Sequence, residues 1–194
     1  MIAFDEMKGG ILVKKVILAL LVMVLLLLMP LCSFAESSTS DEFIYGNGIK
    51  FAMTKEEVES IVGMPDDAND AVLAYMDQKV AGKTSSIGYI FDENYGLYTI
   101  TIQFSDTHTN NNDYIDDFED VDAALLLVYP VGEYTDFYYW KDDLFKDDAS
   151  YYGLAVASGQ LIIGSLYTKG NADISHILVG DNYSITHAIN YTAS

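Results

Sequence analysis

Three histidines and 29 acidic residues give this 194-residue chain its candidates for acid–base or metal chemistry. His176 and His187 lie in two alternating segments that a turn at Asp181-Asn182 separates. A two-residue turn there would place the two imidazoles directly opposite each other on one face of a hairpin. Two facing imidazoles suggest a metal pair, but neither segment supplies a third ligand beside them. We therefore predict that His176 and His187 are partly buried in a sheet, and we expect no metal site.

The loop at 105–113 resembles a calcium-binding loop in its alternation of oxygen-bearing side chains. Its candidate ligands are Asp106, His108, Asn110, Asn112 and Asp117. A calcium loop needs a glycine at its sixth position and a bidentate glutamate at its twelfth, whereas Asn111 and Asp117 stand there. We therefore predict a polar loop that caps the following helix.

Sequence motifs for catalysis are missing. The chain has no Gly-x-Ser-x-Gly, His-Glu-x-x-His or glycine-rich phosphate loop, and its one cysteine, Cys32, lies near the N-terminus. Adjacent acidic pairs such as Asp142-Asp143 point to different sides of the chain, which is typical of a solvated surface. An enzyme is therefore the weaker hypothesis, and no cofactor is expected. A cell-surface hydrolase would need two carboxylates in one pocket, about 5 to 9 Å apart for glycoside chemistry.

Aromatic residues offer a better candidate for function, since the chain has 15 tyrosines and 9 phenylalanines. Tyrosine and tryptophan present rigid contact area with a polar tip, which suits recognition surfaces. Any single one of them can equally fill the core between sheet and helices. The predicted binding residues are Tyr138, Tyr139, Trp140, Tyr151, Tyr167, His176 and His187.

The net charge narrows the classes of partner. Residues 36–194 contain 27 of the 29 acidic residues and 7 of the 10 lysines, which gives a formal charge of −20, and the chain has no arginine. Nucleic acid and anionic lipid surfaces would be repelled. Such acidity favours solubility outside the cell over a charge-steered partner. The hydrophobic fraction of 51% indicates a folded chain.

The N-terminal segment has the layout of a secretory signal peptide. Lys14 and Lys15 precede an apolar run from 16 to 31, and Ser33-Phe34-Ala35 fits a small-residue cleavage site. We expect residues 1–35 to be removed after Ala35, which makes the protein secreted or extracytoplasmic. The alternative is an uncleaved membrane anchor, for which the apolar run is short.

The first element after a linker at 36–42 is a helix with unusually complete end signals. Thr54 and Glu57 form a capping box, and Gly63 ends the helix. Val58, Ile61 and Val62 form an apolar stripe, which we expect to pack on a sheet because so short a helix is marginal in water.

The remaining pattern predicts mostly strands. A second helix runs from the 105–113 loop to Pro130, and the segment with Tyr138, Tyr139 and Trp140 is expected to be a loop. The expected strands cover 72–76, 87–91, 98–104, 151–157, 161–168, 173–179 and 183–192. We therefore predict an α+β fold of tandem helix-plus-antiparallel-meander units at 43–112 and 113–194, with the helices packed on an antiparallel sheet.

The segment "GIKFAMTKEEVESIVGMPD" (48–66) resembles the first helix of the small outer-membrane lipoprotein (SmpA/OmlA) family, with Ala52 in place of that family's glycine. The wider plan resembles the tandem fold of secreted β-lactamase-inhibitor proteins. The segments "YIDDFEDVDAALLLVYP", "WKDDLFKDDASYYGLAVASGQL" and "GDNYSITHAINYT" are similar to exported Firmicutes proteins with no assigned activity.

The departures from these families limit what the resemblance implies. Cys32 follows Met29-Pro30-Leu31, which is a poor lipobox, so no lipid anchor is expected. The inhibitors depend on disulfides, and residues 36–194 contain no cysteine. The sequence therefore favours a secreted, non-enzymatic binding module. We expect it to recognise a protein or cell-envelope component, and no nucleic acid, through an aromatic, acidic sheet face.

Overall fold

The computed structural model describes residues 48–129 and 133–194, which belong to one compact unit. The predicted signal peptide, its cleavage site and the 36–42 linker lie outside the described residues. Within the described part, none of the helices has the length and apolar character needed to cross a membrane.

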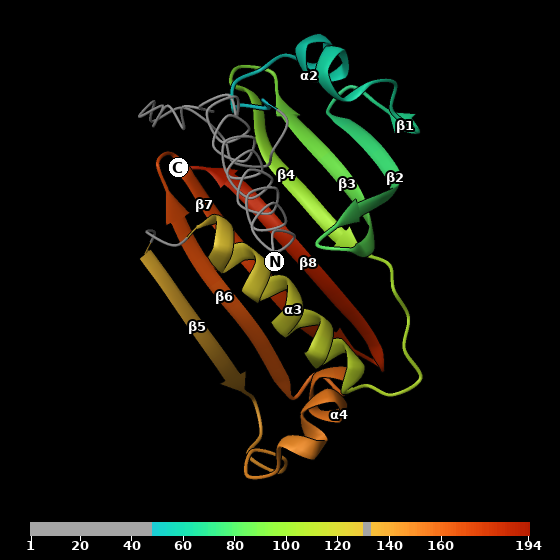
Figure 1. Ribbon diagram of the computed structural model, residues 1–194, viewed down its shortest axis with the longest axis vertical. Coiled ribbons are helices and arrows are strands. Elements are labelled where there is room, and N and C mark those ends of the chain that lie inside the picture. The colour runs from blue at the N-terminus through green and yellow to red at the C-terminus, as the bar shows by residue number, and fades with distance from the viewer. Residues whose placement is uncertain (1–47, 130–132) are drawn as a thin grey trace, which may run out of the picture. The chain divides into compact units, whose positions relative to one another are not determined.

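The central element is one antiparallel sheet of eight strands in the order β1-β2-β3-β4-β8-β7-β6-β5 (Figure 1). The strands are β1 (Asp67–Ala68), β2 (Val72–Val80), β3 (Lys83–Asp92), β4 (Gly96–Phe104), β5 (Glu133–Trp140), β6 (Leu161–Lys169), β7 (Ala172–Asp181) and β8 (Ser184–Ala193). Strands β1–β4 and β5–β8 are two meanders, and their last strands β4 and β8 pair with each other. The α+β class predicted from the sequence is confirmed.

Helix α2 (Lys55–Val62) begins at the predicted capping box. The Thr54 side chain accepts a hydrogen bond from the Glu57 amide (3.2 Å), and the Glu57 carboxylate accepts one from the Thr54 amide (2.8 Å). Val58 is fully buried and Val62 packs against the same core. The prediction that Ile61 belongs to the buried stripe is wrong, because 41% of its surface is exposed. In a helix of two turns, only two residues spaced by four, here Val58 and Val62, face the sheet.

Two elements of the second half differ from the prediction. The segment Glu133–Trp140, expected to be a loop, is strand β5 and pairs with β6 along its whole length. The segment 151–157, expected to be a strand, forms a 3₁₀ turn (Ala149–Tyr151) and the short helix α4 (Tyr152–Ala157). The Asp148 side chain caps the 3₁₀ turn by accepting from the Ser150 amide. The count of four strands in this half holds, and three of them (β6, β7 and β8) are predicted strands, whereas β5 takes the place of the predicted strand at 151–157.

Long-range contacts explain why α4 is helical. The Gly153 amide donates to the Asn112 side-chain oxygen (2.8 Å), and a Cβ on Gly153 would lie 2.3 Å from the Asn111 carbonyl carbon. Apolar alternation in a short segment cannot distinguish a strand from a small-residue helix that packs this closely.

The β7–β8 hairpin has a register two residues away from the predicted one. Its turn residues are Asn182 and Tyr183, both with positive φ (48° and 64°), as in a type I′ turn. His176 therefore lies opposite Ile189, and His187 lies opposite Leu178. The predicted direct pairing of His176 with His187 is wrong. A shift of two residues preserves the face, so both imidazoles still lie on the same side of the sheet.

The helices pack on one face of the sheet, here called the helix face. Helix α3 (Asp113–Val128) lies across β7 and its neighbours, and α4 packs on β6 and β7 (Figure 1). Residues directed to this side are buried, among them Leu73, Ile100, Ile102, Ile174, Leu178 and Ile189. The residues that alternate with them are only partly buried, and no described helix covers that side, here called the open face.

Candidate functional site

Asp122 of α3 is the centre of a buried polar network on the helix face. Its Oδ1 accepts a hydrogen bond from the Tyr167 hydroxyl (2.6 Å) and lies 3.2 Å from His176 Nδ1. Its Oδ2 accepts from the Tyr134 hydroxyl (3.3 Å). One carboxylate therefore connects the helix to β5, β6 and β7.

The two histidines extend this network into the sheet. The Nε2 atoms of His176 and His187 lie 2.8 Å apart, and the exposed fractions of the two side chains are 0% and 4%. If the His176 Nδ1–H donates to Asp122, its Nε2 is left as an acceptor, and His187 Nε2–H must donate to it. The Phe118 ring stacks on His176 at 4.0 Å between centroids, and Phe104 packs on His187 at 4.3 Å.

Burial sets the charges of this network. Burial lowers the pKa of His176, against the opposing effect of Asp122. Burial, and then the neighbouring His176, lower the pKa of His187 to about 3. Burial alone would raise the pKa of Asp122, but its hydrogen bonds from His176 and Tyr167 outweigh this and lower it. At neutral pH the network therefore consists of a carboxylate and two neutral imidazoles.

Ser165, His176 and Asp122 are the residue types of a catalytic triad, but they are not arranged as one. Ser165 lies directly opposite His176 in the β6–β7 ladder. Both ring nitrogens of His176 are engaged, one by Asp122 and the other by His187. No nitrogen is left to take a proton from the Ser165 hydroxyl, as a nucleophilic serine requires.

A groove lies beside the network, between α3 and β5, with a volume of about 190 Å³. We call it the α3–β5 groove, and its lining residues are Phe118, Glu119, Asp122, Ala123, Leu126, Tyr134, Asp136, Tyr138, Ile163, Gly164 and Ser165. Burial, followed by the charge of Asp122, raises the pKa of Tyr134. Burial, followed by the charges of Glu119 and Asp136, raises the pKa of Tyr138. The groove is therefore a site of negative potential.

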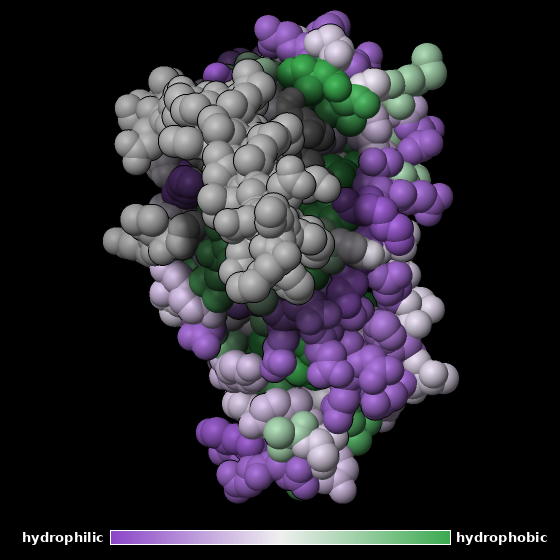
Figure 2. All heavy atoms as spheres, in the orientation of Figure 1, coloured by the Kyte–Doolittle hydropathy of each residue, from purple (hydrophilic) through white to green (hydrophobic). Residues whose placement is uncertain are grey.

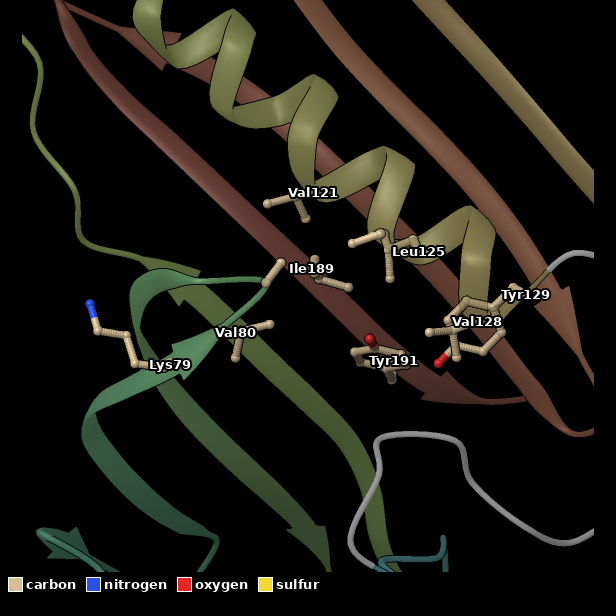
Figure 3. A pocket seen from close by; sticks show the side chains of 10 residues that line it. Lys79, Val80, Val121, Leu125, Val128, Tyr129, Ile189 and Tyr191 are labelled. Atoms are coloured by element: carbon tan, nitrogen blue, oxygen red, sulfur yellow. The ribbon is translucent and has the colours of Figure 1, made fainter. Parts of the chain in front are cut away.

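A second groove, of about 300 Å³, lies between α3 and the turn that joins β2 to β3. Val121 and Leu125 of α3 approach Ile189 of β8 and Val80 of β2, whereas the Lys79 side chain points away (Figure 3). Most of the lining of this groove is apolar, and its polar side chains are those of Lys79, Tyr129 and Tyr191.

The calcium-like loop is held by contacts within the protein. His108 Nε2 lies 2.7 Å from Asp117, which also pairs with Lys83, and Asp106 accepts from the Thr84 amide. The Asn112 side chain joins α3 to α4 and its 3₁₀ turn. Figure 2 shows hydrophilic side chains gathered over the N-terminal half of α3 and the loop before it. Across the described residues, no three His, Cys, Asp or Glu side chains are placed to share a metal ion.

The structure brings together four of the seven predicted binding residues and separates the other three. Tyr138 lines the α3–β5 groove, and Tyr167, His176 and His187 form the network beside it. The remaining three lie elsewhere: Tyr139 is 58% exposed on the open face, Trp140 packs on Tyr152, and Tyr151 packs on Phe145.

The sequence-based prediction missed Asp122, Tyr134 and Ser165. Asp122 follows Phe118 by one helical turn and stands where the apolar stripe of α3 would continue. A carboxylate in an apolar stripe is a signal of a buried polar network.

Comparison of the chain with protein-family models, curated proteins and solved structures gives no match. The argument for function therefore rests on the surfaces and grooves described above.

Proposed function

We propose that the protein is a secreted, non-enzymatic binding module that recognises a protein or cell-envelope partner through the open face of its sheet. The observation that supports this proposal is the near absence of charge on that face, in a chain whose formal net charge is −19. The face proposed here is therefore not the acidic one expected from the sequence. On β4–β8, Asp173 and Asp181 at the two ends of β7 are the charged residues among the described side chains of the open face.

The open face shares one feature with interface centres, which is the depletion of charged residues. Its members on β4–β8 include Thr99, Thr101, Gln103, Thr135, Phe137, Tyr139, Ile162, Leu166, Ser175, Ile177, Val179, Ala188 and Asn190. Interface centres are depleted of charged residues and enriched in aromatic ones. The Phe137 ring lies over Gly164, where a Cβ would come within 2.4 Å of the Phe137 Cζ atom. This contact restricts the ring before any partner arrives, which lowers the entropic cost of binding.

The test is capture from the native cell surface by the immobilised protein and two lysine variants. Ile177→Lys places a charge in the centre of the open face, and Leu127→Lys places one on α3, where 84% of the leucine is exposed. We expect a partner that the wild type and Leu127→Lys retain and Ile177→Lys loses. Equal retention by all three folded proteins would contradict the proposal. N-terminal sequencing of secreted material, expected to begin at Glu36, tests the secretion.

A hydrolase that uses clustered carboxylates is the second candidate, because Glu119, Asp122 and Asp136 all line the α3–β5 groove. A general acid needs a raised pKa, whereas that of Asp122 is lowered. Turnover of a glycoside, ester or peptide substrate that Asp136→Asn abolishes, without loss of folding, would establish this candidate in place of the first.

A further inference from the structure

We propose that the outer edge of β5 binds an extended segment of a partner polypeptide, which carries lysine or arginine at alternate positions and joins the sheet as an additional strand. This edge is a different surface from the open face, so the inference is independent of the function proposed above.

Strand β5 ends the sheet on one side. Figure 1 shows it at the margin of the sheet, with β6 as its one strand neighbour. The two strands pair in unbroken register over all eight residues of β5. Within the described part of the chain, no backbone group outside this ladder forms a hydrogen bond with β5. Its outer edge therefore presents unpaired peptide groups, which can act as a template for another strand.

The register identifies the residues whose peptide groups point outward. The Lys141 amide donates to the Gln160 carbonyl (2.8 Å), and these two residues continue the β5–β6 register by one step. Hydrogen-bonded pairs alternate with non-hydrogen-bonded pairs along an antiparallel ladder. The odd-numbered residues of β5 therefore bond to β6, and the N–H and C=O groups of the even-numbered residues point away from the sheet. The even-numbered residues are Tyr134, Asp136, Tyr138 and Trp140.

The opposite edge of the sheet has protection that β5 lacks. There β1 has only two residues, and β2 beside it has a bulge between Tyr75 and Gln78. The Met76 amide on that side donates to the Asp66 carboxylate (2.7 Å), so this donor is already used. Short strands, bulges, lysine and proline are common means of blocking edge pairing. Strand β5 has none of them, since its sequence lacks lysine and proline and its register has no shift.

The side chains of β5 offer apolar contact to an added strand. Tyr134, Tyr138 and Tyr139 are large aromatic residues that remain partly exposed beside the edge. Pairs of aromatic and β-branched side chains on neighbouring strands stabilise a sheet. A neighbouring strand would cover these rings, and it would gain this contact in addition to main-chain hydrogen bonds. Both contributions are typical of peptides that bind by strand addition.

Charge determines which kind of segment fits. The sequence of β5 contains two acidic residues, Glu133 and Asp136, and no basic one. No lysine forms an ion pair with Asp136 in the part of the chain that the structure describes. A residue directly opposite Asp136 points to the same face of the sheet, and opposite charges there stabilise the pair. A second copy of this chain would bring another acidic β5 and a further net charge of −19, so a basic segment of a different chain fits better.

The test is a calorimetric titration of the full secreted protein, at neutral pH, with the peptide acetyl-Thr-Lys-Val-Lys-Val-Lys-Thr-amide. Its lysines can lie opposite the even-numbered residues of β5 and bond to their outward peptide groups. One control peptide has backbone N-methyl groups at its lysines, which removes these donors, and another has glutamate in place of lysine. We expect saturable binding of the first peptide and none of the controls. No binding of the first peptide, or equal binding of either control, would overturn the proposal.

Two substitutions at one position locate the binding. Asp136→Pro removes an outward N–H, which an edge strand tolerates because no hydrogen bond to β6 is lost. Asp136→Ala is the matched control, because it removes the same carboxylate and keeps the N–H. Asp136→Pro should weaken peptide binding about tenfold more than Asp136→Ala, through the loss of a main-chain hydrogen bond. Equal affinity of the two folded variants would show that the peptide does not pair with β5. The N-methylated peptide tests the same hydrogen bonds on the unaltered protein.

Sedimentation of the protein alone distinguishes a different chain from a second copy. We expect a monomer. A dimer that Asp136→Pro dissociates and Asp136→Ala does not would identify a second copy as the occupant of the edge, and it would overturn the proposal of a basic segment.

Discussion

The Asp122 carboxylate occupies an apolar position of α3, between Phe118 and Leu125, and gathers side chains from three strands. The alternation along β7 and β8 was enough to predict that His176 and His187 share a buried face. It could not predict their partner, because Asp122 is far away in sequence and reaches them only through packing of the helix on the sheet. The register was missed because Tyr183 adopts a positive φ, which residue types other than glycine, asparagine and aspartate seldom do.

Stability should fall as the pH drops below about 6.5, because the imidazoles of the unfolded chain become protonated there, whereas those of the folded network stay neutral. The pKa of His187 is about 3 in the folded protein, so its imidazole stays neutral while the unfolded one is protonated. Between pH 7 and pH 5, this residue should lower the free energy of unfolding by about 2 kcal/mol, and His176 should lower it further.

Urea unfolding of the wild type and His187→Gln at pH 7, 6 and 5 measures this dependence. The variant lacks one of the two titrating imidazoles, so its unfolding free energy should change less steeply with pH, whatever its stability at pH 7. Identical slopes for the two proteins would mean that the buried imidazoles do not govern acid stability. Carboxyl groups with a lowered pKa, such as Asp122, act only at lower pH.

At the scale of elements, the end signals of α2 gave a reliable prediction, and the short apolar segments of the second half did not. The capping box of α2 and the helix after the 105–113 loop are confirmed, but the predicted cap of that second helix is wrong, because its N-cap residue Asn112 makes no side-chain capping hydrogen bond. The segment of β5 was predicted to be a loop and is a strand, whereas the segment of α4 was predicted to be a strand and is a helix. The aromatic residues of β5 suited either a loop or a strand, and α4 is specified by the contact of Gly153 with Asn111 and Asn112, which no local pattern reveals.

Gly153→Ala should destabilise the protein by about 1–3 kcal/mol, because the new methyl group would meet the Asn111 backbone at 2.3 Å. Gly88→Ala is the matched control, since a Cβ there meets nothing within 4 Å and alanine suits a strand better than glycine. We expect the control to be neutral or slightly stabilising in urea unfolding. A neutral Gly153→Ala would show that α4 does not pack closely on the start of α3.

At the scale of the whole molecule, the two meanders join through the β4–β8 pair, so one sheet places the helix face and the open face on opposite sides. The charged residues are distributed unequally between the two faces. The N-terminal half of α3 gathers acidic residues on the helix side, whereas the open face on β4–β8 is nearly uncharged. An uncharged face remains available for contact while the rest of the acidic surface keeps the molecules apart.

The same charge distribution makes a prediction about salt. Like charges far outnumber ion pairs, which in the described part are Lys83 with Asp117 and Asp120, Lys146 with Asp143, and two histidine contacts. Raising NaCl from 0.01 to 0.1 M shortens the screening length from about 30 Å to about 10 Å, which weakens repulsion across the molecule more than it weakens contacts of a few ångströms. The midpoint of thermal unfolding should therefore rise with salt over this range. A midpoint that falls would mean that the lysine ion pairs outweigh the self-repulsion, and Lys83→Met should then remove most of the salt dependence.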